Sequence, residues 1–416
     1  MWKATTRLKA SLYIGRRIVR RYQVTAMGIS LTALGAATAF SNPPTAVSVV
    51  AALAGIIVST TEVLSNVRQA RKIRFQRREA DDYRDLLSGH EKAGRVVRTP
   101  RDVGIQMVRE TEFLRNNLIP VKVNQEPFTL HPHIEKFSLL FLSHRLRQSM
   151  MFNGMTLGLD ADIPNAPKSP AVFRPVGYYD FVSTNLLSPY DVGEVGRQEP
   201  LLHGRSLIFD SRGNLRNLSL SRLANVVGVS VLAFTTEGKL LVVCQTLDVA
   251  GSPGLVAPSG SGALEPRDLA GAGASSLQRT ILSGALRELR EECHLEQEDL
   301  AGEAEVIGYG RWVSRGAMPE FCALALLNKS ADQVLRKPIR PDERSFVGDV
   351  AAIRFPSVRD WSAVEPLDLL PPTYRHAVSW PLAFSLTCLV ESLQDPSWDL
   401  GSKLMSRLSS GETGEA

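Results

Sequence analysis

Three glutamates in the middle of the chain have the clearest potential for chemistry. Read as a helix, residues 284–295 place Glu288, Glu291 and Glu292 on one side, because residues three and four apart are neighbours on a helix surface. Carboxylates this close repel one another unless a cation lies among them, and Mg²⁺ prefers oxygen ligands, completed by water and substrate phosphates. Arg287 precedes Glu291 by four residues and can orient it. The alternative is an ordinary amphipathic helix with a solvated acidic face. The face of this helix opposite the glutamates is apolar and comprises Leu282, Ala285, Leu286, Leu289 and Cys293.

The sequence around these glutamates resembles the Nudix box of the Nudix hydrolases. Residues 287–295, Arg-Glu-Leu-Arg-Glu-Glu-Cys-His-Leu, follow the family pattern Arg-Glu-hydrophobic-x-Glu-Glu-x-Gly-hydrophobic. Upstream, Pro-Ser-Gly-Ser-Gly at 258–262 resembles the family's glycine-rich loop, with Gly260 and Gly262 as ligand-binding residues and Asp268 where the family has glutamate. The resemblance implies a Mg²⁺ cofactor. Its ligands would be the three glutamates, which would act with Arg287 as catalytic residues.

Two departures from the family pattern surround the box. Residues 269–276 are rich in Ala, Gly and Ser and lengthen the segment before the helix, which indicates a loop insertion. His294 replaces the glycine that ends the family's helix, where a positive φ is favoured. Histidine is among the non-glycine residues enriched at positive φ. We therefore predict that the turn is kept, with an imidazole directed towards the site.

A second group of functional candidates lies at 310–320. In Nudix hydrolases an acid beyond the box often binds metal or acts as base, and Glu320 is the expected residue, with Glu343 as the second choice. Arg311 and Arg315 are suited to bidentate phosphate contacts, and Trp312 offers a face for base stacking. The alternative is a strand with solvated arginines and a core tryptophan.

The surrounding pattern predicts an α/β fold. Strand signals at 226–234 and 239–245 flank a turn at 235–238, and two more strands are expected at 304–309 and 321–327. Helices are expected at 102–117, 132–151 and 371–393. Together with the resemblance, this order implies a Nudix-type α/β/α sandwich around a mixed sheet.

The amino end has the pattern of a membrane anchor. Seven Lys and Arg residues precede the first acidic residue, and two uncharged runs follow at 24–40 and 45–61, separated by Ser-Asn-Pro-Pro. Each run is near the minimum length for a membrane-spanning helix. A signal peptide or a buried helical hairpin is the alternative. Basic flanks on both sides predict a transmembrane hairpin with both termini in the cytoplasm. Small residues along both runs favour close helix contacts and homo-oligomers.

These patterns divide the chain into five parts. A basic leader with the hairpin occupies 1–66, a charged stalk helix and linker 67–94, a part of uncertain role 95–220, the Nudix domain 221–408 and a disordered tail 409–416. The net charge of +5 is too small to predict binding of a nucleic acid polymer. Four scattered cysteines indicate a reducing compartment.

A hairpin joined to a Nudix domain resembles the transmembrane Nudix effectors of bacterial cyclic-oligonucleotide antiphage signalling (CBASS). This resemblance implies that the domain binds a cyclic nucleotide, that binding clusters the hairpins in the lipid bilayer, and that the inner membrane is disrupted as an antiviral defence. One alternative is a membrane-tethered hydrolase that cleaves nucleoside diphosphate-linked substrates with Mg²⁺. Another is a membrane scaffold whose Nudix fold binds only protein.

Overall fold

The chain is described by a computed structural model that divides it into two compact units. The described residues are 72–89, 94–148, 151–166, 168–246, 254–271, 276–337, 347–358 and 360–410. One unit comprises 1–76, 139–152 and 191–202, and the other comprises 77–138, 153–190 and 203–416. None of the described helices combines the length and apolar character needed to cross a bilayer. The two predicted membrane runs, at 24–40 and 45–61, lie outside the described residues.

The smaller unit contains a sheet of three short strands. Its order is β1 (Ile73–Arg77), β7 (Tyr190–Glu194) and β8 (Leu202–His203). The prediction of a stalk helix over 67–94 is therefore wrong at β1. Ile73 and Phe75 alternate with polar residues, a period of two that suits a strand, and the ring of Phe75 packs edge-on against Phe141, 5.2 Å between centroids.

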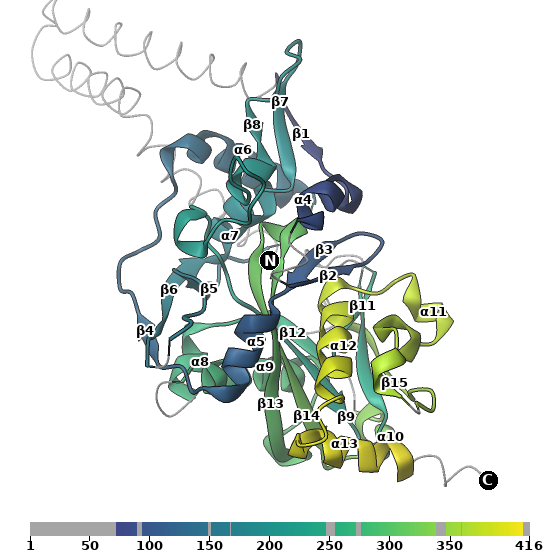
Figure 1. Cartoon of the computed structure of the whole chain (residues 1–416). Helices are drawn as coiled ribbons and strands as arrows, with labels where there is room; N and C mark the ends of the chain where they lie inside the picture. The colour runs from purple at the N-terminus through teal and green to yellow at the C-terminus, as the bar shows by residue number, and fades with distance from the viewer. Residues whose placement is uncertain are drawn as a thin grey trace, which may run out of the picture. The chain divides into compact units, whose positions relative to one another are not determined.

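The larger unit is built on a mixed sheet of nine strands within the described residues (Figure 1). The main path of the sheet is β11-β10-β9-β14-β13-β3-β2, with β12 paired to β9 and β15 paired to β10. β9 and β14 run parallel, and the other paired strands described in this sheet are antiparallel. The bounds are β2 (Arg95–Arg98), β3 (Val103–Gln106), β9 (Gly228–Phe234), β10 (Leu240–Gln245), β11 (Val256–Ala257), β12 (Gly260–Ala263), β13 (Leu300–Trp312), β14 (Met318–Leu327) and β15 (Val347–Ile353).

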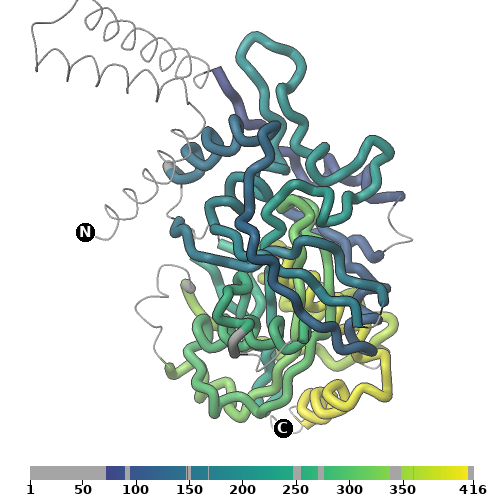
Figure 2. The backbone as a smooth tube through the Cα atoms, turned by 90° about the vertical axis from the view of Figure 1, so that its left-hand side faces the viewer, coloured from purple at the N-terminus to yellow at the C-terminus, as the bar shows by residue number. Residues whose placement is uncertain are grey.

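Helices cover both faces of this sheet. α9 (Leu277–Glu292) contacts β9, β12, β13 and β14, whereas α12 (Trp380–Ser392) contacts β9, β13 and β14 from the other side. In Figure 2 the yellow α13 (Asp399–Ser410) lies beside the green central strands, and it contacts β13. Further helices are α4 (Arg84–Ser88), α5 (Val108–Asn116), α6 (Pro132–Gln148), α7 (Tyr178–Thr184), α8 (Pro266–Gly271), α10 (Ala331–Leu335) and α11 (Pro372–Arg375). A separate sheet has the order β4 (Val121–Val123), β6 (Ala171–Gly177) and β5 (Met155–Leu159).

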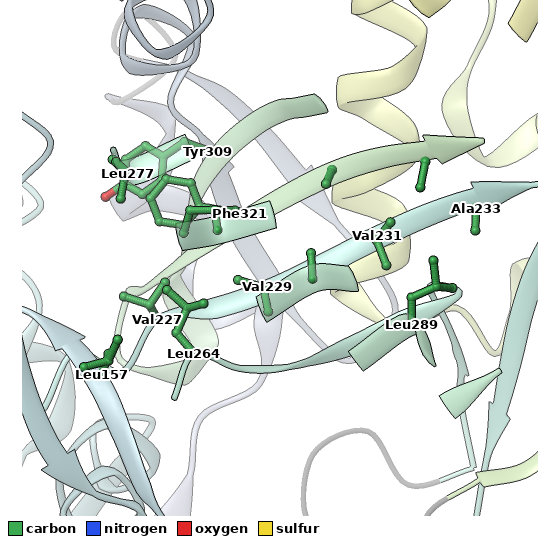
Figure 3. Close-up of a cluster of buried hydrophobic side chains, with 14 of the residues drawn as sticks. Leu157, Val227, Val229, Val231, Ala233, Leu264, Leu277, Leu289, Tyr309 and Phe321 are labelled. Carbon is green, nitrogen blue, oxygen red and sulfur yellow. The ribbon is translucent and has the colours of Figure 1, made fainter. Parts of the chain in front are cut away.

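The core between α9 and the sheet follows from strand alternation. Successive side chains of a strand point to opposite faces, so every second residue of β9 and β14 faces α9. Figure 3 shows this cluster, in which the valines of β9 meet Leu289 of α9. Its fully buried members include Val229, Val231, Phe321, Ala323, Ala285 and Leu289. The intervening residues of both strands therefore face α12.

The predicted mixed α/β organisation is confirmed, including the strands at 226–234, 239–245, 304–309 and 321–327. β2 and β3 extend the same sheet, so residues from the part of uncertain role contribute directly to it. The helix expected at 102–117 is instead β3 followed by α5, because Val103 and Ile105 are buried in the sheet.

Candidate functional site

The helix α9 is positioned by a cap at each end and by its apolar stripe. Ser276 is the N-cap, and its side chain accepts a hydrogen bond from the Arg279 N–H at 3.3 Å. At the other end His294 has φ of 57°, and the Leu295 N–H donates to the Arg290 carbonyl at 3.2 Å. This six-to-one bond after a left-handed residue is a Schellman turn. The prediction that histidine keeps the turn is confirmed.

Gly260 and Gly262 allow β12 to approach α9 closely. A Cβ on Gly260 would lie 2.4 Å from the backbone nitrogen of Leu289, and one on Gly262 would lie 2.1 Å from Oε1 of Glu288. Glycine is therefore required for packing at position 260, where the neighbours are backbone atoms, whereas at position 262 a Cβ would displace the carboxylate of Glu288. The structure brings the predicted glycine-rich loop and the predicted box together, as strand against helix.

We expect the change Gly260→Ala to lower the free energy of unfolding by about 1–3 kcal/mol, the usual cost of overpacking. The reason is that the atoms in the way belong to the helix backbone, which cannot turn aside. Urea unfolding followed by tryptophan fluorescence measures the loss. Gly154→Ala is the matched control, because its added Cβ meets nothing within 4 Å. Equal stability of the two variants would contradict the close approach.

Arg287 is the centre of a buried network of carboxylates. Its Nε and Nη2 donate to the two oxygens of Asp268 at 2.9 and 3.0 Å. Its Nη1 donates to Glu288 at 2.7 Å and to Glu291 at 3.2 Å, and Nη2 also reaches the Ala263 carbonyl at 2.9 Å. Burial alone would lower the pKa of Arg287, but the Asp268 hydrogen bonds and the Glu288 charge raise it above its ordinary value. The guanidinium therefore stays charged and ties α8, which carries Asp268, to α9.

Two of the three box glutamates share Arg287, and the third has a separate partner. Glu288 contacts Arg287, and Glu291 accepts from both Arg287 and Arg267, each at 3.2 Å. Glu292 accepts from the Ser261 N–H at 3.1 Å. Within the described residues, no three His, Cys, Asp or Glu side chains are grouped so that they could hold one metal ion. In this arrangement the three carboxylates do not fit a shared ion, and Mg²⁺ binding stays a prediction.

Glu288 has the chemistry of a proton acceptor near neutral pH. Burial raises the pKa of Glu288 to about 7, although the charge and hydrogen bond of Arg287 act to lower it. A carboxyl group with a pKa near the working pH can take up and release a proton efficiently. This is a specific observation in favour of acid–base chemistry at the box.

A cavity of about 360 Å³ opens beside the network. Its lining includes three guanidinium groups, those of Arg267, Arg287 and Arg290, and three carboxylates, those of Asp268, Glu291 and Glu296. Arg267 also pairs with Glu265 at 2.7 Å, and the Nε of Arg290 donates to the Leu286 carbonyl at 3.2 Å. Guanidinium forks match phosphate oxygens. The N–H groups of Arg287 are already donated to Asp268, Glu288, Glu291 and the Ala263 carbonyl, so Arg267 and Arg290 are the donors that this cavity offers to a phosphate-bearing group.

Glu320 is not brought to this cavity. Its neighbour Phe321 belongs to the cluster facing α9, so Glu320 points to the α12 face. There Ser230 donates to Glu320 at 2.6 Å. Burial raises the pKa of Glu320 to about 8, and the Ser230 hydrogen bond and the Arg315 charge act against this shift. Glu343, the second choice, lies outside the described residues.

Arg311 and Trp312 are buried among protein partners. Arg311 donates to the Ala317 carbonyl at 2.5 Å and to Asp162 at 3.1 Å. Trp312 lies 5.2 Å from the parallel ring of Trp380, and the Arg315 guanidinium is 4.0 Å from the Trp312 ring. The arrangement matches the alternative of a core tryptophan, since Trp312 is only 2% exposed. The structure does not bring these residues to the box.

Two residues of the cavity, Arg267 and Arg290, were not among the predicted site residues. Arg290 could have been found from helix periodicity, because it lies three residues after Arg287 on α9. Arg267 carries no such signal, since its place depends on how α8 folds back against α9.

Comparison with known proteins does not identify a family. No family model matches this sequence, and no curated protein matches it. One similar solved structure is described as the crystal structure of DR0079 from Deinococcus radiodurans. It is 15% identical, the match covers 30% of this chain and 65% of that chain, and the TM-score is 0.21. This degree of similarity assigns neither a family nor a function.

Proposed function

We propose that this chain is a membrane-anchored Nudix-like effector that binds a cyclic nucleotide second messenger in the cavity beside α9. Ligand binding would cluster the amino-terminal hairpins and disrupt the inner membrane in antiphage defence. The observation that carries the binding step is the cavity of about 360 Å³, which the guanidinium groups of Arg267 and Arg290 line next to the box helix. The membrane step depends on the resemblance in architecture alone.

The contacts of the glutamates favour binding over turnover in this proposal. Glu288 and Glu291 hold Arg287, and Glu292 holds the backbone of β12 at Ser261. Glu292 fastens the glycine-rich strand to α9, and Arg287, held by Glu288 and Glu291, fastens α8 to it through Asp268. They would thereby keep Arg267 and Arg290 in place for an anionic ligand. No step of the proposal passes through Mg²⁺.

The test is equilibrium binding of cyclic di- and trinucleotides to the full-length protein in detergent, with recovery of intact ligand measured by chromatography. We expect at least one cyclic nucleotide to bind without being consumed and to increase the oligomer size. Because each reversal removes a phosphate donor and adds repulsion, Arg267→Glu with Arg290→Glu should weaken binding at least tenfold.

Arg279→Glu provides the matched control, since Arg279 lies exposed on the same helix and outside the cavity. An equal loss of affinity in this control would show that general charge, and not the cavity, determines binding. Failure of every cyclic nucleotide to bind would refute the proposal.

The second candidate is a membrane-tethered Nudix hydrolase, favoured by the pKa of about 7 at Glu288. Incubation with Mg²⁺ and nucleoside diphosphate derivatives should then release a phosphorylated product. The double change Glu288→Gln and Glu292→Gln should abolish that release, because the variant lacks the group that accepts the proton. If the double variant is still toxic to the cell that expresses it, cleavage is not the activity that kills the cell.

A further inference from the structure

A second feature of the larger unit is the uncovered edge of β13. β13 pairs with β14 over its length, but with β3 only through Gly310 and Arg311. Apart from β14, no described strand pairs with residues 304–307. A strand edge of this kind presents backbone N–H and C=O groups that can accept a further strand.

This edge opens into a cavity of about 800 Å³. Ala304, Glu305, Val306 and Ile307 form one wall, α5 contributes Arg115, and the loop before α13 contributes Trp398. The cavity shares no lining residue with the 360 Å³ cavity beside the box. It is therefore a separate candidate site within the same unit.

Arg115 shows that an edge acceptor of β13 points into the cavity. Its Nη2 donates to the Ile307 carbonyl at 2.7 Å and also contacts Ser392. A side chain thus occupies a position that the N–H of an adjacent strand would take.

The lining is strongly acidic. Five carboxylates contribute to it, against the single guanidinium of Arg115, and they belong to Glu112, Glu305, Glu391, Asp395 and Asp399. Glu391 is paired with Arg95 at 3.6 Å and Asp399 with Lys403 at 3.0 Å. If the paired Glu391 and Asp399 are set aside, the carboxylates of Glu112, Glu305 and Asp395 still face the single guanidinium of Arg115. The charge favours a basic occupant.

The two sides of the edge differ in character. Ala304 and Val306 pack against the apolar cluster facing α9. Glu305 points to the other side, where its Oε2 accepts from the Trp398 indole at 2.7 Å. An extended peptide alternates its side chains in the same way. A basic side chain of such a peptide would meet the carboxylate of Glu305 and the indole of Trp398, which favours a cation–π contact. The next side chain would point the other way and meet the apolar surface beside Ala304 and Val306.

We propose that this edge binds an extended segment of a partner protein in which basic and apolar residues alternate, and that the segment adds a strand to β13. Four residues, 304–307, form this edge, which corresponds to about 13 Å of strand, and Arg115 must release the Ile307 carbonyl for the segment to pair along all of it. Backbone hydrogen bonds supply affinity in this mode, and alternate side chains supply specificity. The site is independent of the cyclic-nucleotide proposal.

The probe is a fluorescein-labelled peptide, Lys-Val-Lys-Val-Lys-Val, titrated with the full-length protein in detergent and followed by fluorescence anisotropy. Two derivatives carry N-methyl groups, one on the lysines and the other on the valines. We expect the parent to bind and at least one derivative to lose tenfold or more in affinity, because N-methylation removes the paired N–H groups. Glu-Val-Glu-Val-Glu-Val should bind at least tenfold more weakly.

On the protein, Glu305→Lys with Asp395→Lys should weaken binding at least tenfold. Glu298→Lys is the control, because Glu298 is exposed and lies outside the cavity. Arg115→Ala should tighten binding, since it frees the Ile307 carbonyl and removes the opposing charge. The proposal is overturned if the parent peptide does not bind at about 1 mM, a weak affinity for any specific site, or if both N-methylated peptides bind as tightly as the parent.

Discussion

Replacement of Arg287 by methionine is expected to destabilise the larger unit by about 3–5 kcal/mol, the cost of removing one partner from a buried ion pair. The side chain of Arg287 is only 8% exposed and that of Asp268 only 2%. Without the guanidinium, Asp268 and Glu288 would remain buried next to each other without a compensating charge. Urea denaturation of the full-length protein in detergent, followed by tryptophan fluorescence, measures the free energy of unfolding.

The pH dependence of this loss provides a second readout. Carboxylates that have lost their cation have a raised pKa in the folded state, so protonation relieves them at low pH. We therefore expect the deficit of Arg287→Met to be smaller at pH 5 than at pH 8. Arg290→Met is the control on the same helix, because Arg290 donates to the Leu286 carbonyl and not to the carboxylates of the network. A deficit that is small and independent of pH would refute a structural role for the network.

The change Glu320→Gln is expected to stabilise the protein at high pH. In the unfolded chain this carboxyl group loses its proton near pH 4.5, whereas burial raises the pKa to about 8 in the folded state. Between these values the folded state binds more protons, so the free energy of unfolding of the unaltered protein falls as pH rises. The amide has no proton to lose. The oxygen of the amide can still accept the Ser230 hydrogen bond. Below pH 4.5 the carboxyl group is protonated in the folded and the unfolded state, so the gain in stability does not change with pH there.

The expected gain of Glu320→Gln over the unaltered protein, measured at pH 9 relative to pH 5, is on the order of 3–5 kcal/mol. Glu288 acts in the same direction between about pH 4.5 and 7, so part of the pH dependence should persist in the variant. Glu298→Gln at the exposed surface should change nothing. Equal stability of Glu320→Gln and the unaltered protein at pH 9 would show that the buried carboxyl does not resist ionisation.

Local sequence signals were sufficient for most of the central elements. The three- and four-residue spacing of Leu282, Ala285, Leu286, Leu289 and Cys293 predicts the carboxyl-terminal part of α9, because one helix face must be apolar. The left-handed turn at His294 was predicted from its place in the box, where the family has glycine, and from the enrichment of histidine at positive φ. Both features depend on interactions within a few residues, which a sequence pattern contains directly.

The same signals failed at residues 73–77 and 103–106. Both segments were expected to lie in helices, but Phe75, Val103 and Ile105 are strand residues in the structure. Pairing with strands distant in sequence, such as β3 with β13, outweighed the local preference. Sequence periodicity does not reveal such pairing, because β13 lies some 200 residues after β3 in the chain.

The sequence by itself determined which residues cluster on α9 and that Arg287 contacts Glu291. Only the tertiary structure decided how the other charged groups are shared and that Gly260 and Gly262, expected to bind ligand, allow β12 to approach α9. It assigned Glu288 to Arg287 and Glu292 to Ser261, and it turned Glu320 to the opposite face of the sheet. The physical reason is that the direction of a strand side chain depends on register, and a shift of one residue reverses it. Spacing along the chain does not contain that register.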